Sequence, residues 1–383
     1  TFGVCLGMGY SWQFALLAVF VEGLVFLALS LTPVREAIFN CIPFTLKKAV
    51  AAGIGLFICF IALQTAKIIV NNDAVLVGLM SFKNAPFHTQ GICATLAILG
   101  TILTGVMMAR NVKGAILYGI FVTWGLGMAA QAAGVYVPDP KAGYFSLYPA
   151  LSFAGIADSF AQFKTTCCAV FDPAGWTHKG DANTGWALVK GLDFFVVMFA
   201  FFFVDLFDTL GTLIGVSMKG GFLTKEGKLP RISGALCADA IATSVGAVFG
   251  TSTTTTYVES ASGVMAGGKT GLTAVTTAVL FLAALVFAPV FLAVPGFATA
   301  PALIVVGYLM LSSVAEIDFS DASEAIPAFL TVAFMPFAYS ISDGIMAGVI
   351  SYTLVNLIAG KAKKIHWIMY VLTAVFIAKY ALM

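Results

Sequence analysis

Long apolar runs separated by short polar or basic stretches dominate the hydrophobicity pattern of this chain. A helix needs roughly 20 residues to cross a hydrocarbon layer about 30 Å thick, which is the scale of these runs. Because lipid offers the backbone no hydrogen-bond partners, we expect them to be helical. The runs lie at 12–32, 49–70, 91–109, 113–135, 190–216, 232–249, 271–293, 299–314, 325–340, 342–359 and 365–382.

The composition agrees with a membrane protein. Of the 383 residues, 60% are apolar and 10% are charged, whereas a soluble domain carries about 25% charged residues. The mean hydropathy of +0.99 has the same origin. The net charge of +2 forms no basic stripe, so a nucleic-acid partner is not expected. The sequence therefore predicts an all-α polytopic protein whose surroundings are the lipid bilayer.

Lys and Arg are concentrated in alternate connections between the runs, which orients the chain by the positive-inside rule. If 33–48 is cytoplasmic and the polar stretch 251–268 counts as one crossing, the short outer connections carry Lys83 alone. We therefore expect 251–268 to cross or re-enter a membrane and the chain to be a multi-pass protein of the cell membrane. The inner residues are Arg35, Lys47, Lys48, Arg110, Lys113, Lys219, Lys225, Lys228, Arg231, Lys269, Lys361, Lys363 and Lys364.

An internal repeat is indicated by two similar successions of runs and turns, in which VKGAILYGIFVT corresponds to SDGIMAGVISYT. The second unit, 190–359, holds seven crossings, and two odd-numbered units in tandem have opposite topology. The first unit, 1–135, shows four, so we expect three more crossings, roughly 60–100 residues, ahead of Thr1. Between the units, 136–189 is interpreted as an extracytoplasmic loop that caps the protein. The C-terminal hydrophobic segment, 360–383, either spans the membrane or lies on it.

Charged residues inside membrane spans are costly and point to function. Asp205 and Asp208 lie within FFFVDLFDTLGTLIGV, and their i, i+3 spacing predicts that both face the same side of one helix. Two adjacent carboxylates in a dry site repel each other, so one of them is expected to hold a proton near neutral pH. For Glu22, Asp239 and Gln64, which also lie in or near spans, a structural role is favoured.

The stretch GTSTTTTYVESASGV, from Gly250 to Val264, reads as a broken crossing. Four consecutive threonines favour an extended strand over a helix. The residues after them are compatible with a half-helix, whose start would present free N–H groups and Glu259 to a ligand. Irregular backbone at membrane depth is tolerated where it lines a cavity. The alternative is an ordinary polar loop, which the alternation of basic connections disfavours.

Enzyme chemistry finds no support in the sequence. The three histidines lie at loops or span edges, and no nucleotide, nucleophile or metal-ligand spacing is present. We therefore expect no enzymatic activity, no cofactor and no metal site.

The motifs FVDLFDTLGTLIGV, GTSTTTTYVESASGV and GLTAVTTAVLF resemble the nucleobase:cation symporter-2 family. The AzgA-like permeases for adenine, guanine and hypoxanthine are the most similar branch. GMGYSWQ, SLTPVREAIFNCIP and YSISDGIMAGVISY also match it, and the resemblance covers the chain except 136–189.

The resemblance implies fourteen segments in two inverted repeats of seven, with a core domain and a gate domain that often contacts a second subunit, as in a homodimer. It makes 190–216 segment eight and 251–268 segment ten; segments one to three would precede Thr1. One bundle is expected to contain 12–32, 190–216, 232–249, 251–268 and 271–293. The other is expected to contain 49–70, 91–109, 113–135 and 299–359.

The expected function is import of purine nucleobases by proton symport. Glu259 and Asp205 would bind the purine across a cavity, together with the hydroxyls of Thr254, Thr255 and Ser260, while Asp205 and Asp208 would handle the proton. The alternatives are transport of another nucleobase or a small anion, such as uracil or xanthine, or a non-transporting sensor. Which purine is bound, and whether proton or sodium is coupled, stay open.

Overall fold

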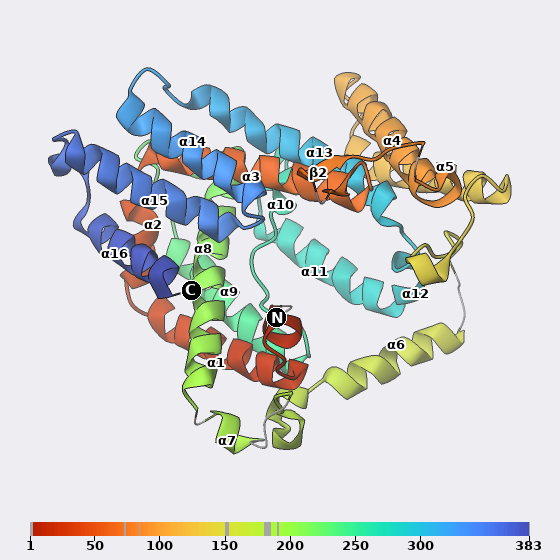
Figure 1. The fold of residues 1–383 in the computed structure, drawn as a ribbon, viewed down its shortest axis with the longest axis horizontal. Helices are drawn as coiled ribbons and strands as arrows, with labels where there is room; N and C mark the ends of the chain where they lie inside the picture. Colours follow the sequence, from red (N-terminus) through yellow and green to blue (C-terminus); the bar gives the residue numbers. More distant parts are fainter. Residues whose placement is uncertain are drawn as a thin grey trace. The chain divides into compact units, whose positions relative to one another are not determined.

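The apolar runs form helices in the computed structural model, which describes residues 3–72, 74–83, 85–149, 153–179, 185–189 and 191–382 (Figure 1). Most helix bounds lie within four residues of the runs, but the helix for 49–70 is Phe44–Thr65 and the helix for 271–293 ends at Val286. They are α1 (Trp12–Ser30), α3 (Phe44–Thr65), α4 (Ile92–Ala109), α5 (Ala115–Ala132), α8 (Leu192–Gly220), α9 (Ile232–Val248), α11 (Gly271–Val286), α13 (Gly296–Leu311), α14 (Ala322–Phe337), α15 (Ile341–Ile358) and α16 (Trp367–Leu382).

Seven of the described helices are long and apolar enough to cross a membrane, and four shorter apolar helices accompany them. The expected polytopic helical architecture is therefore confirmed. The shorter ones, α9, α11, α14 and α16, begin or end next to turns and irregular segments. Short helices at membrane depth need protein neighbours to satisfy the backbone that follows them.

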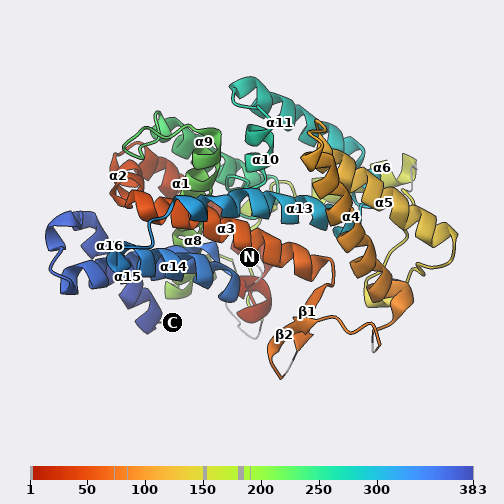
Figure 2. The same cartoon turned by 90° about the horizontal axis from the view of Figure 1, so that it is seen from above.

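Smaller elements occupy the connections. These are α2 (Val34–Cys41), α6 (Phe153–Thr166), α7 (Trp186–Val189), α10 (Ser260–Met265), α12 (Ala288–Phe291) and the antiparallel strands β1 (Ile69–Asn72) and β2 (Leu76–Leu79), which are visible in Figure 2. The β1–β2 hairpin corrects the strictly all-α expectation. The helix in the predicted run 49–70 ends at Thr65, and the last residues of that run belong to β1. The 136–189 connection is partly helical through α6; its residues 150–152 and 180–184 lie outside the described part.

The described chain divides into two compact units. One comprises Thr1–Ala51, Phe160–Val258 and Val314–Met383, and the other comprises Ala52–Ser159 and Glu259–Ser313. This division differs from the expected bundles, because 259–268 and 271–293 join the second unit whereas α14 and α15 belong to the first. Helices α14 and α15 follow each other through a tight turn and pack tightly, which keeps them in one unit.

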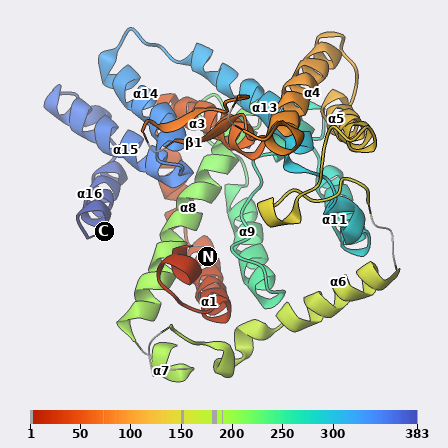
Figure 3. The same ribbon diagram turned by 45° about the vertical axis from the view of Figure 1, so that its right-hand side comes forward.

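In the first unit, α1 packs against both α8 and α9, as Figure 3 shows. Gly23 of α1 lies directly against Ser244 of α9, and a Cβ atom there would collide with the Ser244 side chain and backbone. Small residues permit this close approach, as at many helix interfaces in membranes. The contact fixes the depth of the neighbouring residue, Glu22, between the helices.

In the second unit, α4, α5 and α13 pack together. Helices α4 and α5 exchange glycine–threonine contacts: Gly100 lies against Thr123, and Gly119 lies against Thr104. Each threonine hydroxyl donates to the carbonyl oxygen four residues earlier, at 2.7 Å, so neither hydroxyl is left unpaired in the interface. The run of small residues thereby brings two apolar helices together without burying an unsatisfied hydroxyl at these contacts.

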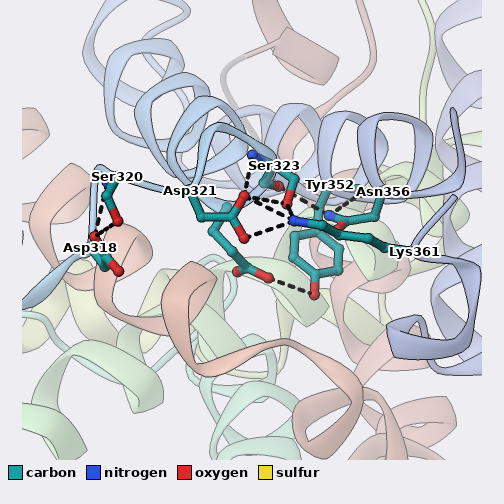
Figure 4. A network of polar contacts seen from close by, with 8 residues as sticks. Asp318, Ser320, Asp321, Ser323, Tyr352, Asn356 and Lys361 are labelled. Atoms are coloured by element: carbon teal, nitrogen blue, oxygen red, sulfur yellow. Dashed lines mark hydrogen bonds and ion pairs between the residues drawn. The ribbon is translucent and has the colours of Figure 1, made fainter. Parts of the chain in front are cut away.

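A polar network joins the start of α14 to the end of α15 (Figure 4). Asp321 caps α14 by accepting from the backbone N–H of Ser323 at 3.0 Å. Lys361, which follows α15, donates to Asp321 Oδ2 at 2.8 Å and to Ser323 Oγ at 2.6 Å. Asn356 of α15 donates to the Ser323 carbonyl oxygen at 3.0 Å. The Asp321 carboxylate therefore caps the start of α14 and binds it to Lys361, in the connection that follows α15.

We expect Asp321→Asn to lower thermal stability slightly and to remove a pH-dependent part of it. Hydrogen bonds from Lys361 and Ser323 hold the pKa of Asp321 below its ordinary value. The stabilisation is therefore present above the ordinary pKa of aspartic acid and is lost as pH falls through the lowered folded-state pKa. Unfolding temperatures measured from neutral to acidic pH would test this. Asp158→Asn, on the exposed side of α6, is the control and should leave the pH profile unchanged.

Candidate functional site: a buried carboxyl cluster

Helix α8 brings Asp205 and Thr209 to one face, because residues four apart lie one above the other on a helix. Both are buried. The Thr209 hydroxyl lies 3.4 Å from Asp205 Oδ1 and 3.1 Å from Asp239 Oδ2. A hydroxyl has one proton to donate. Thr209 can therefore support either carboxylate, but only one at a time.

Glu22 enters the same place from α1 and is fully buried, with 0% of its surface exposed. Among the described residues, neither of its carboxyl oxygens has a hydrogen-bond donor, and Asp205 Oδ2 likewise lacks one. The polar group that Glu22 reaches is the Asp205 carboxyl. The cluster thus contains two carboxyl groups in contact, and the described part of the chain places no cation on Glu22.

Asp239 of α9 is the third acidic member, and it has a cation. Arg35 of α2 lies 3.4 Å from Asp239 Oδ2, and both side chains are almost fully buried. Arg35 also donates to Ser30 Oγ at 2.9 Å and to the Leu236 carbonyl oxygen at 3.2 Å. The guanidinium lies 4.3 Å from the centre of the Phe26 ring. These contacts offset the desolvation of a buried ion pair, which is otherwise large.

The extended residues after α9 are held against this cluster. Thr255 Oγ1 lies 2.9 Å from Thr209 Oγ1, and the Thr254 carbonyl oxygen accepts from Thr243 Oγ1 at 3.1 Å. The backbone N–H of Thr251 donates to Gly246 at 3.0 Å. The described residues 251–256 form no strand, which corrects the expected strand. Bonds to α9, rather than a neighbouring strand, satisfy the Thr251 N–H and the Thr254 carbonyl oxygen of this segment.

We expect Gly23→Ala to destabilise the first unit by about 1–3 kcal/mol, the usual cost of overpacking. The added methyl group would meet the backbone and side chain of Ser244, so α1 and α9 must separate. Gly105→Ala is the matched control, because this helical glycine of α4 has open space around it. Thermal unfolding in detergent would compare them. A Gly23→Ala protein as stable as the Gly105→Ala protein would contradict this packing.

The sequence-predicted residues divide between the two units. Asp205 and Thr255 belong to the cluster, Thr254 adjoins it through its carbonyl oxygen, and Asp208 is half-buried one turn from Asp205. Glu259 and Ser260 are exposed at the start of α10 in the other unit, so their place opposite Asp205 stays a prediction.

Sequence reasoning missed three members of the cluster. The sequence favours structural roles for Glu22 and Asp239, and their positions inside apolar runs are the signal that points to the cluster. Arg35 was counted with the basic residues of a loop, and one residue in a loop carries no signal of its burial. Within the described residues, no group of three His, Cys, Asp or Glu side chains is arranged to hold a metal ion. The cluster is suited to holding protons and polar hydrogen-bond donors.

Comparisons with known proteins agree with this picture. A family model described as a permease family matches residues 1–347. The guanine/hypoxanthine permease PbuG of Bacillus subtilis is 42% identical over 367 residues, which is 96% of this chain and 75% of that protein. PbuO of the same organism, also a guanine/hypoxanthine permease, is 39% identical over 96% of this chain and 77% of its own length. The adenine permease AdeP of Escherichia coli is 36% identical over 99% of this chain and 76% of its own length.

Proposed function

The chain belongs to the permease family whose model it matches, and from that premise we propose that it imports purine nucleobases by proton symport. Membership makes it a multi-pass membrane transport protein and not an enzyme. The relatives named as guanine/hypoxanthine and adenine permeases support purines as the substrate class.

The observation that carries the proton part is the buried carboxyl cluster. Glu22, Asp205 and Asp239 are all buried in the helix bundle and interact electrostatically, and among the described residues Arg35 is the cation that accompanies them. Ionisable groups at such depth are costly and characterise proton pathways. Thr255 connects this cluster to the extended segment that precedes Glu259. Proton occupancy of the cluster can therefore influence a substrate held beside that segment, and the influence is reciprocal by linkage.

Uptake of labelled adenine, guanine and hypoxanthine into proteoliposomes that contain the protein tests the proposal. Accumulation should be driven by an inwardly directed proton gradient and abolished by a protonophore. Sodium gradients test which ion is coupled. Uracil and xanthine test which nucleobase is the substrate. Accumulation that ignores both pH and the protonophore would contradict proton symport, while efficient uptake of uracil alone would contradict the choice of purine.

We expect Glu259→Gln to weaken purine affinity roughly ten- to hundredfold, the loss of one charge-assisted hydrogen-bond contact. A neutral purine offers N–H groups, and a carboxylate can accept two of them, whereas an amide presents one oxygen and donates from the other side. Competition binding in membranes would measure the change. Glu316→Gln, an exposed carboxyl outside the proposed site, should bind purine like the native protein. Equal affinities for both variants would remove Glu259 from the binding site.

A further inference from the structure

Glu22 poses a problem that the proposed function leaves unsolved. A fully buried carboxylate to which none of the described residues donates would lack both hydration and hydrogen bonds, which is among the most unfavourable arrangements in a protein. Gly23 packs closely on Ser244, so α1 and α9 are in direct contact beside Glu22. Something must therefore satisfy the Glu22 side chain where it lies.

The group within its reach is another carboxyl, that of Asp205. Two ionised carboxylates only accept hydrogen bonds, so they cannot bond to each other. Adding one proton changes this, because a carboxylic acid donates to a carboxylate in a short, strong hydrogen bond. The same proton also removes one of the two buried negative charges. This bond gives a partner to Asp205 Oδ2 and to one of the two unpartnered oxygens of Glu22.

The charged groups around the pair distinguish it from the rest of the cluster. From α9, Asp239 faces Glu22 and is neutralised by Arg35 of α2. Asp239 also accepts from Thr209 and from the backbone of Thr256. From α8, Asp208 lies one turn from Asp205 and interacts with it. Asp239 thus has a cation and hydrogen-bond donors, whereas the described part of the chain offers Glu22 none.

We propose that Glu22 and Asp205 share one proton, and that this carboxyl pair, rather than Asp205 with Asp208, is the proton site of the transporter. The inference rests on the proposed symport for its role in transport, but the shared proton itself does not. When the proton leaves, both carboxylates are charged and repel. The Thr209 hydroxyl can then turn from Asp239 to Asp205. Because Thr209 is also bonded to Thr255, loss of the proton reaches the extended segment.

Infrared difference spectroscopy of the protein in lipid tests the shared proton directly. The native protein should show the carbonyl band of a protonated carboxylic acid near neutral pH, and it should disappear in Glu22→Gln and shift or disappear in Asp205→Asn. Glu226→Gln, an exposed carboxyl beside Lys228, should keep it. Absence of the band from the native protein, or its persistence unchanged in Glu22→Gln, overturns the proposal. If Glu22→Gln does not fold, an unchanged band in Asp205→Asn overturns the proposal instead.

The pH profile of purine binding tests the role of the pair in transport. One linked proton changes affinity by at most about tenfold for each pH unit, with tighter binding at lower pH for a symporter. Glu22→Gln should flatten this profile, while Glu226→Gln should reproduce the native one. A merely structural Glu22 would weaken binding equally at every pH, and that result overturns its role as a proton carrier. Native accumulation that ignores a protonophore would instead overturn the symport, and the infrared band would still decide the shared proton.

Discussion

Asp205→Asn should abolish accumulation of purine against a gradient, because it removes the carboxyl at the centre of the cluster. Asp205 contacts Glu22 and lies 3.4 Å from Thr209 Oγ1, so it connects the proton to the extended segment. An asparagine amide has nearly the same shape but cannot gain or lose a proton near neutral pH. The variant should therefore equilibrate purine without concentrating it. Uptake under mildly acidic and mildly alkaline conditions, about one unit either side of neutral pH, with and without a protonophore, is the measurement.

Asp208→Asn is the informative comparison for this prediction. Asp208 is half-buried on the same helix and interacts with Asp205 without belonging to the hydrogen-bonded cluster. Its loss should weaken accumulation rather than abolish it. Asp318→Asn, on the exposed connection before α14, should behave like the native protein. An Asp205→Asn variant that still concentrates purine would exclude Asp205 from proton coupling.

The helices could be predicted from the sequence because each is a local property of its own run. Trp12–Ser30 and Ile232–Val248, for example, match the predicted 12–32 and 232–249 within two residues at each end. A long apolar stretch with few charges defines each run. The hairpin of β1 (Ile69–Asn72) and β2 escaped this reasoning, since Ile69 and Val70 are apolar and were included in the run 49–70 although Lys67 precedes them.

The site was harder to predict because its members come from several distant elements. The i, i+3 spacing favoured Asp208 as the partner of Asp205, yet the contacts of Asp205 are Thr209 at i+4 and Glu22 on α1. Helical periodicity selects a face but does not identify what packs against it. The burial of basic residues could not be predicted from the sequence either. Lys47, for example, is 2% exposed and donates to the Gly227 carbonyl oxygen at 2.8 Å. Only packing of the distant segments determines that a basic residue near a span end is buried.

Arg35→Met should cause the largest loss of stability of any single change considered, about 3–5 kcal/mol, the usual effect of removing one partner from a buried ion pair. Methionine fills a similar volume beside Phe26, so little of the loss would come from packing. The cost arises because Asp239, 6% exposed, would keep its charge without its cation. Thermal and denaturant unfolding of the purified protein in detergent would measure it, with Arg110→Met at an exposed turn as the control.

The double variant Arg35→Met with Asp239→Asn separates the charge from the shape of the side chains. If the uncompensated Asp239 carboxylate is the cause, replacing it with a neutral amide should recover a large part of the lost stability, since replacing both partners of a buried pair is often nearly neutral. The recovered protein should nevertheless transport poorly. The neutral amide has one acceptor oxygen where the Asp239 carboxylate, which accepts from Thr209 and the Thr256 backbone, has two, so the segment would be held less firmly to the cluster. If the double variant is no more stable than Arg35→Met, the loss of stability comes instead from the bonds of Arg35 to Ser30 and Leu236.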